Sequence, residues 1–140
     1  MVHALEEIRR VLIPGGILID LRPVAANWPI EVVSRRERQS AGRVTDLAEG
    51  LQLDEAANRT IATAAERGWY QREQERSFPF NYYWDSPEQM LEFVREEWAD
   101  FASVDEDAMR RVRSLWAVAD ADARVRVQLS MLITRWGRLP

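Results

Sequence analysis

The stretch ALEEIRRVLIPGGILIDLRP, residues 4–23, decides the fold prediction, because it contains a helix, a glycine turn and a strand. Apolar side chains in its first half recur at the spacing of one helical stripe, and charged side chains fill the opposite face. Pro14 cannot continue the helix, and Gly15 and Gly16 supply the permissive backbone of a turn. Ile17–Leu21 is a short apolar run, typical of a strand covered on both faces. Such a helix and strand form half of a βαβ crossover.

The next segments carry signals of unequal strength. Residues 24–53 show little periodicity, so we expect an irregular or mobile segment there. A helix is predicted over Asp54–Arg67, with Gly68 as its stop. Trp69–Trp84 is rich in aromatic and β-favouring residues and predicts a strand, which Pro79 restricts to a sheet edge or a bulge.

Two helices and a strand complete the chain. Ser86 is placed to cap a helix that has proline at its first position and Gln89 in the place of a capping box. Asp105 is placed to cap the next helix. Arg124–Trp136 alternates apolar and polar residues and predicts the last strand. We therefore expect an α/β fold, with one three-stranded mixed sheet and packed helices in a single domain of 140 residues.

Composition excludes several classes of site. The chain has no cysteine and one histidine, which excludes disulfides and cysteine-ligated metals and leaves little scope for a metal centre or a histidine-based triad. All 19 basic residues are arginine, yet they alternate with acidic residues, and the net charge of −4 argues against a nucleic-acid or anionic-membrane surface. Because no apolar run reaches about 18 residues and no signal-peptide pattern is present, we expect a cytoplasmic protein.

Three segments resemble class I S-adenosylmethionine-dependent methyltransferases. RVLIPGGILI, residues 10–19, resembles the end of the helix, the Pro-Gly-Gly turn and the apolar strand that join that family's fourth and fifth strands, although Ile13 stands where Lys or Arg is usual. FPFNYYWDSPEQMLEFV, residues 78–94, resembles the sixth strand and its following helix, and RVRVQLSMLITRW, residues 124–136, the final strand. The resemblance implies the carboxyl-terminal half of a Rossmann-like fold, with its last strand antiparallel between the other two.

The cofactor half of that family has no counterpart in these 140 residues. Family members hold S-adenosylmethionine at a glycine-rich turn after the first strand and at an acidic residue after the second. Gly15 and Gly16 instead join a helix to a strand. The resemblance therefore implies a truncated methyltransferase domain that binds no cofactor alone, and S-adenosylmethionine only if a partner chain completes it. No catalytic residue is assigned.

Five residues form a candidate substrate pocket: Pro23, Trp28, Tyr82, Tyr83 and Trp84. They follow the ends of two elements that the family places near its acceptor site. Aromatic walls with a few polar tips suit small apolar ligands. Alternatively, these side chains build the core or contact a partner.

Other charged residues have two interpretations each. Asp20, beside Arg22 in an apolar strand, either shapes a substrate pocket or forms an ion pair at an uncovered edge. His3 could act as a base, but a residue near a chain terminus is expected at the surface. Glu6–Glu7 and Asp105–Asp107 are expected to face solvent and to interact favourably with helix dipoles.

The sequence leaves three hypotheses of function. The first is the carboxyl-terminal part of a methyltransferase that acts with a separate cofactor-binding chain. The second is a non-catalytic remnant that forms a homodimer or larger homo-oligomer through the first helix and strand 17–21, since leaving a former internal seam in water forfeits about 25 cal/mol per Å². The third is a small-molecule binding module that uses the aromatic residues. The methyl acceptor is not identified.

Overall fold

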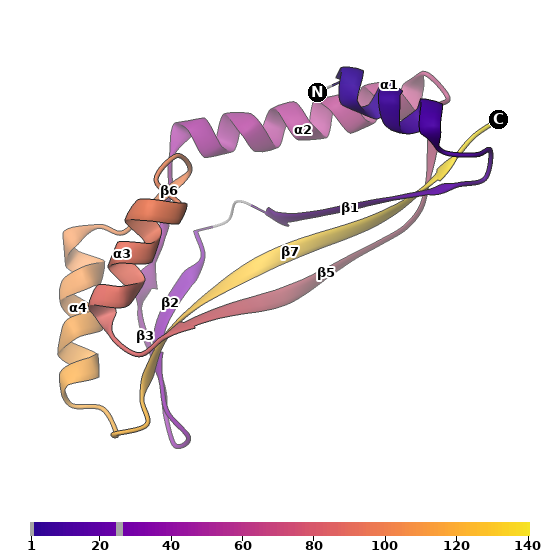
Figure 1. Cartoon of the computed structure of the whole chain (residues 1–140). Coiled ribbons are helices and arrows are strands. Elements are labelled where there is room, and N and C mark those ends of the chain that lie inside the picture. Colours follow the sequence, from indigo (N-terminus) through magenta and orange to yellow (C-terminus); the bar gives the residue numbers. More distant parts are fainter. Residues whose placement is uncertain (1, 25–26) are drawn as a thin grey trace. The chain divides into compact units, whose positions relative to one another are not determined.

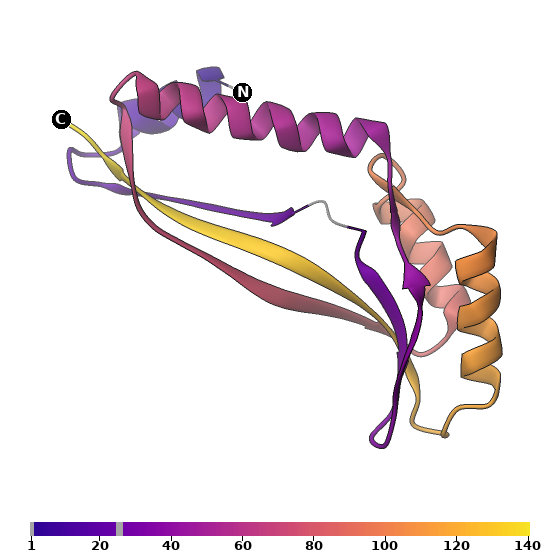
Figure 2. The ribbon, with the colours of Figure 1, turned by 180° about the vertical axis from the view of Figure 1, so that it is seen from behind.

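The computed structural model describes residues 2–24 and 27–140 (Figures 1 and 2). These residues form four helices and seven strands. The helices are α1 (Val2–Val11), α2 (Ala48–Glu66), α3 (Pro87–Glu97) and α4 (Glu106–Ala117). The strands are β1 (Ile17–Val24), β2 (Pro29–Val33), β3 (Arg38–Arg43), β4 (Thr45–Asp46), β5 (Tyr70–Trp84), β6 (Ala102–Ser103) and β7 (Arg124–Arg138).

Internal contacts divide the chain into two compact units, each described by itself. Unit 1 comprises the described residues of Met1–Val24, Gln52–Phe78 and Met131–Pro140, and unit 2 those of Ala25–Leu51 and Pro79–Ser130. The strands β5 and β7 contribute residues to both units.

β7 is the central strand of a five-stranded sheet. It hydrogen-bonds to β1, β2 and β5, and β3 follows beyond β2. The Arg138 N–H donates to the Gly16 carbonyl at 2.8 Å, so the end of β7 meets the start of β1 and the two strands are antiparallel. β2 is antiparallel to both β7 and β3, and Figure 1 shows β7 running opposite to both β1 and β5. A separate two-stranded sheet pairs β4 with β6.

The predicted mixed α/β class is confirmed, but the prediction of a three-stranded sheet is wrong. Residues 24–53, predicted to be irregular or mobile, contain β2, β3, β4 and the start of α2. Within this segment only the apolar residues Ile30, Val32 and Val33 favour a strand by their sequence. β3 has the polar sequence RQSAGR, and it joins the sheet through backbone pairing with β2, which side-chain periodicity does not report.

The β2–β3 hairpin and helices α3 and α4 form the core of unit 2 (Figure 2). The strands β2 and β7 and the helices α3 and α4 supply eight of its buried side chains: Ile30, Val32, Val125, Val127, Met90, Val94, Met109 and Val112. Gly42 allows α4 to approach β3. A Cβ at Gly42 would lie 3.2 Å from the Ala108 Cβ, and the Gly42 φ of +134° is one that other residues rarely adopt.

The core of unit 1 lies between helices α1 and α2 and strands β1, β5 and β7. Ala64, Tyr70 and Trp136 are buried at its centre. Partly buried side chains surround them: Leu5, Leu12, Leu18, Ile61, Ala65 and Trp69. The Tyr70 hydroxyl donates to the Leu5 carbonyl at 2.9 Å, which ties β5 to α1, and burial raises the pKa of Tyr70.

Two strands differ from their predicted burial. β1 is not covered on both faces, because Ile17, Ile19 and Leu21 are exposed while Leu18 packs on the core of unit 1. In β7 the predicted alternation holds in unit 2, where odd-numbered residues from 125 to 129 are buried. In unit 1 this alternation is lost, because the buried residues are Thr134, Trp136 and Gly137, and Trp136 packs on Tyr70 and Ala64.

Both predicted helix caps are confirmed. The Ser86 hydroxyl accepts a hydrogen bond from the Gln89 N–H, and the Asp105 carboxylate accepts one from the Ala108 N–H. The Gln89 side chain accepts from the Asp85 N–H, one residue before the position that a capping box requires. Gly68, with a φ of +68°, ends α2 as predicted. No helix within residues 2–24 and 27–140 is both long and apolar enough to cross a membrane.

Ser86→Ala tests the cap of α3. The variant loses the hydrogen bond to the Gln89 N–H, so its free energy of unfolding should fall by about 1 kcal/mol, measured by urea denaturation. The control is Ser114→Ala in the interior of α4, where the hydroxyl donates to the Arg110 carbonyl and the side chain is exposed. It should change stability by less than about 0.5 kcal/mol. Equal losses in the two variants would contradict the cap.

Candidate functional site

Three of the five predicted pocket residues meet around Trp98 in unit 2. The ring centroids of Trp28, Tyr82 and Trp84 lie 5.2, 5.4 and 6.2 Å from that of Trp98, each in an edge-to-face arrangement. Phe93 also contacts Tyr82, Trp84 and Trp98. Trp28 and Trp98 are about 95% buried, so these rings pack on one another as part of the interior of unit 2.

Tyr83 and Pro23 do not join this cluster by any described ring contact. Tyr83 is exposed and hydrogen-bonds Arg126, and its ring lies 5.9 Å from the Arg124 guanidinium. It differs from Tyr82 and Trp84 because neighbouring side chains of a strand point to opposite faces. Pro23 is exposed and belongs to β1 in unit 1. The ligand-binding role of the five residues stays a prediction.

A polar network, defined here as Glu31, Arg38, Tyr83 and Arg126, lies on the sheet of unit 2. Glu31 on β2 pairs directly across from Arg126 on β7. The Arg126 Nε donates to the Glu31 Oε2 at 2.9 Å, Nη2 donates to the same oxygen, and the Arg38 Nε lies 3.2 Å from Oε1. Both the Glu31 and Arg126 side chains are nearly 90% buried.

The electrostatics of this network favour the ion pair. Burial of the Arg126 guanidinium acts to lower its pKa, but the hydrogen bonds to Glu31 and Tyr83 outweigh burial and raise the pKa. Both carboxylate oxygens of Glu31 therefore face cations, and the network stabilises β2 against β7. Sequence reasoning missed Glu31, which lies within the apolar run IEVV, although the alternation of β7 did place Arg126 on a polar face.

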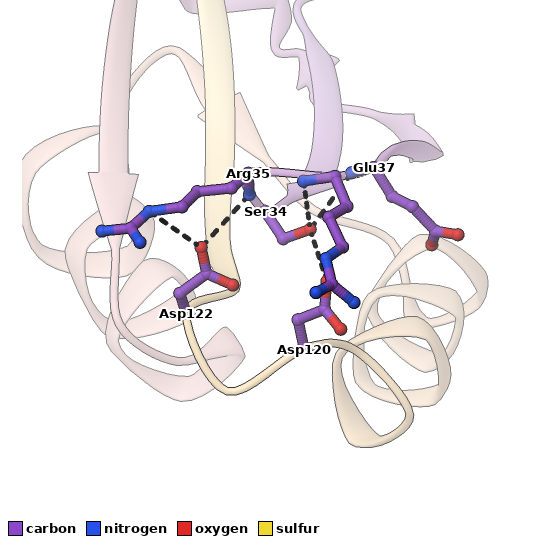
Figure 3. Close-up of polar contacts among 6 residues, drawn as sticks. Ser34, Arg35, Glu37, Asp120 and Asp122 are labelled. Atoms are coloured by element: carbon purple, nitrogen blue, oxygen red, sulfur yellow. Dashed lines mark hydrogen bonds and ion pairs between the residues drawn. The ribbon is translucent and has the colours of Figure 1, made fainter.

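A cavity of about 500 Å³ opens beside the turn between α4 and β7. It is lined by Trp116, by alanines and by Asp85, Asp120, Asp122 and Arg124. Figure 3 shows how two of the aspartates reach the β2–β3 turn. The Ser34 hydroxyl donates to Asp120 at 3.1 Å, and the Arg35 N–H donates to Asp122 at 3.2 Å.

The carboxylates of this cavity all have partners within the chain. Asp85 lies 2.8 Å from the Arg124 guanidinium, and Asp122 is 3.6 Å from that of Arg35. The Ser34 hydroxyl, while donating to Asp120, accepts from the N–H groups of two residues of its own turn. These contacts hold two loops together. Among residues 2–24 and 27–140 no group of three carboxylate or imidazole side chains is arranged to hold a metal ion.

The β1 surface, defined as Ile17, Ile19 and Leu21, is an exposed apolar stripe in unit 1. The three side chains are 44%, 51% and 55% exposed. An open cavity of about 420 Å³ lies beside the stripe, where Ile19 and Ile133 meet Gln74, Arg76 and Arg135. Contiguous exposed apolar residues on a protein surface are typical of an interaction site.

The remaining candidate residues have structural partners or face solvent. Asp20 pairs with Arg22 at 3.3 Å in a partly buried ion pair, one of the two arrangements that the sequence left open. The His3 side chain is 84% exposed and lies 3.6 Å from Glu6.

No protein-family model, curated protein or solved structure matches the chain. A functional argument therefore rests on the residues and contacts described above.

Glu31→Ala tests the polar network. The variant leaves the Arg126 guanidinium nearly buried without its carboxylate, so the free energy of unfolding should fall by about 3 kcal/mol in urea denaturation. The control, Glu55→Ala, removes a carboxylate whose pair with Arg59 is about two-thirds exposed. It should cost less than about 1 kcal/mol. Equal losses in the free energy of unfolding of the two variants would contradict a stabilising role for the polar network.

Proposed function

We propose that the chain is the carboxyl-terminal, acceptor-side part of a class I S-adenosylmethionine-dependent methyltransferase, and that the cofactor-binding half lies outside these 140 residues. One observation carries this proposal. β7 hydrogen-bonds to both β1 and β5, and β1 follows a helix and a Gly-Gly turn. This is the strand arrangement that the resemblance implies for the fifth, sixth and last strands of the family.

The described residues do not fit S-adenosylmethionine by themselves. The Gly16 N–H donates to the Ile13 carbonyl at 2.8 Å, so the Gly-Gly turn closes on its own backbone, and it joins a helix to a strand. The aspartates that line the cavity of about 500 Å³ already have partners. Asp120 accepts from the Ser34 hydroxyl, Asp122 accepts from the Arg35 N–H, and Asp85 forms an ion pair with an arginine. In this proposal the cofactor-binding half supplies the whole cofactor site, and these 140 residues contribute to positioning the acceptor.

A second candidate function is self-association without catalysis. The exposed β1 surface supports it, and exposed Val11 and Ile13 at the end of α1 add to the apolar area. Covering such side chains contributes about 25 cal/mol for each Å² removed from water. A second copy of the chain is one source of that cover.

Isothermal titration with S-adenosylmethionine tests the first candidate. The isolated chain should give no binding heat, because its glycine turn joins a helix to a strand and the cofactor half of the family has no counterpart in these 140 residues. The chain combined with the polypeptide encoded directly upstream of it should bind in the micromolar range. A complete class I methyltransferase serves as the positive control. Micromolar binding by the isolated chain, or no binding by the combination, would refute the proposal.

A further inference from the structure

The backbone N–H and C=O groups of alternate residues in β1 point to its two opposite edges. β1 is at one end of the strand order, and among the described residues only β7 pairs with it as a strand. The Gly16 carbonyl accepts from β7, and backbone groups along an antiparallel strand alternate between its two sides. The even-numbered residues of β1 therefore direct their N–H and C=O groups to β7. The N–H and C=O groups of Ile17, Ile19 and Leu21 therefore point to the outer edge, away from β7.

These same three residues carry the exposed apolar side chains of the β1 surface. A strand edge with unpaired backbone groups and apolar side chains is a template for another strand. Pairing there would satisfy the backbone groups and cover the side chains in one step.

The edge that is open to pairing has two defined ends. On one side, the Gly15 N–H already donates to the Arg138 carbonyl at 3.1 Å. On the other side, Pro23 has no N–H to donate. Between these ends the outward-facing residues are Ile17, Ile19 and Leu21, so the middle of the open edge is Ile19.

We propose that two copies of the chain pair through β1, antiparallel, about a twofold axis at Ile19. Ile19 then faces Ile19 of the second copy, and Ile17 faces its Leu21. Each of these pairs exchanges two backbone hydrogen bonds and places two apolar side chains together on one face. This inference deepens the second candidate function, and it does not require the first.

Other registers use the edge less well. A shift of the axis to Leu21 sets Ile19 against Pro23, which cannot donate. A shift of the axis to Ile17 sets Ile19 against Gly15, whose N–H already donates to the Arg138 carbonyl. A second copy also suits the charges, because Asp20 keeps Arg22 as its partner within one chain and brings no unpaired charge to the seam.

Single cysteines test the register, since the natural chain contains none. Ile19→Cys should form a disulfide dimer under mild oxidation, because the Cα atoms of directly paired residues lie about 5.5 Å apart. Ile17→Cys alone should not, because the two copies of residue 17 would be about 13 Å apart along the strands. A mixture of Ile17→Cys and Leu21→Cys should cross-link. Non-reducing gels measure each outcome.

Ile19→Lys tests the association itself. Sedimentation equilibrium of the natural chain should give about twice its mass of 16.3 kDa, and the variant should dimerise at least about tenfold more weakly because two ammonium groups meet at the axis. Ile19 is half exposed, so the fold should tolerate lysine, which circular dichroism checks. The control is Val118→Lys, at an 82% exposed apolar residue of unit 2, which should leave the dimer unchanged.

Three results would overturn the inference. The first is a natural chain that stays monomeric at about 100 μM, a concentration at which a complex with a micromolar Kd would be mostly formed. This result would exclude self-association and leave the edge to a different polypeptide. Equal cross-linking of Ile17→Cys and Ile19→Cys would exclude the register. Unchanged dimerisation of a folded Ile19→Lys variant would exclude this edge. The cofactor titration is a separate measurement: binding by the isolated chain, or no binding by the combination, refutes the first candidate function whatever the result of the dimer experiments.

Discussion

The sheet depends on β7, because this one strand hydrogen-bonds to β1, β2 and β5. Its 15 residues supply buried side chains to the cores of both units. Val125 and Val127 meet α3 and α4 in the core of unit 2, and Trp136 packs on Tyr70 in unit 1. Since β1 has no other strand partner among the described residues, the edge available for association exists only because β7 holds β1 in extended form.

Most of the polar and aromatic side chains described above have partners within the chain, whereas the β1 surface is exposed. Glu31 and Arg126 bond each other, and the aspartates of the larger cavity bond Ser34, Arg35 and Arg124, so these polar groups stabilise loops and strands. The aromatic rings around Trp98 are likewise used in packing. The β1 surface differs, because its apolar side chains and outer backbone groups gain most from a partner strand. Association is therefore common to both proposed functions.

Local signals predicted most of the long elements and few of the short ones. The caps at Ser86 and Asp105 and the stop at Gly68 were predictable because each depends on groups within one turn of backbone. β3 was not predictable, since its polar residues join the sheet through backbone bonds to β2. The Glu31–Arg126 pair joins residues 95 positions apart, and no local pattern reports such a contact.

The sequence by itself determined the helix, Gly-Gly turn and strand at residues 4–23, the long alternating strand after residue 124, and the absence of cysteine chemistry. Only the tertiary structure decided which faces are buried. Ile17, Ile19 and Leu21 are as apolar as Leu18, yet they are exposed, because α1, α2 and Trp136 cover one side of β1. Hydrophobicity states what a side chain favours, whereas burial depends on which elements the fold brings against it.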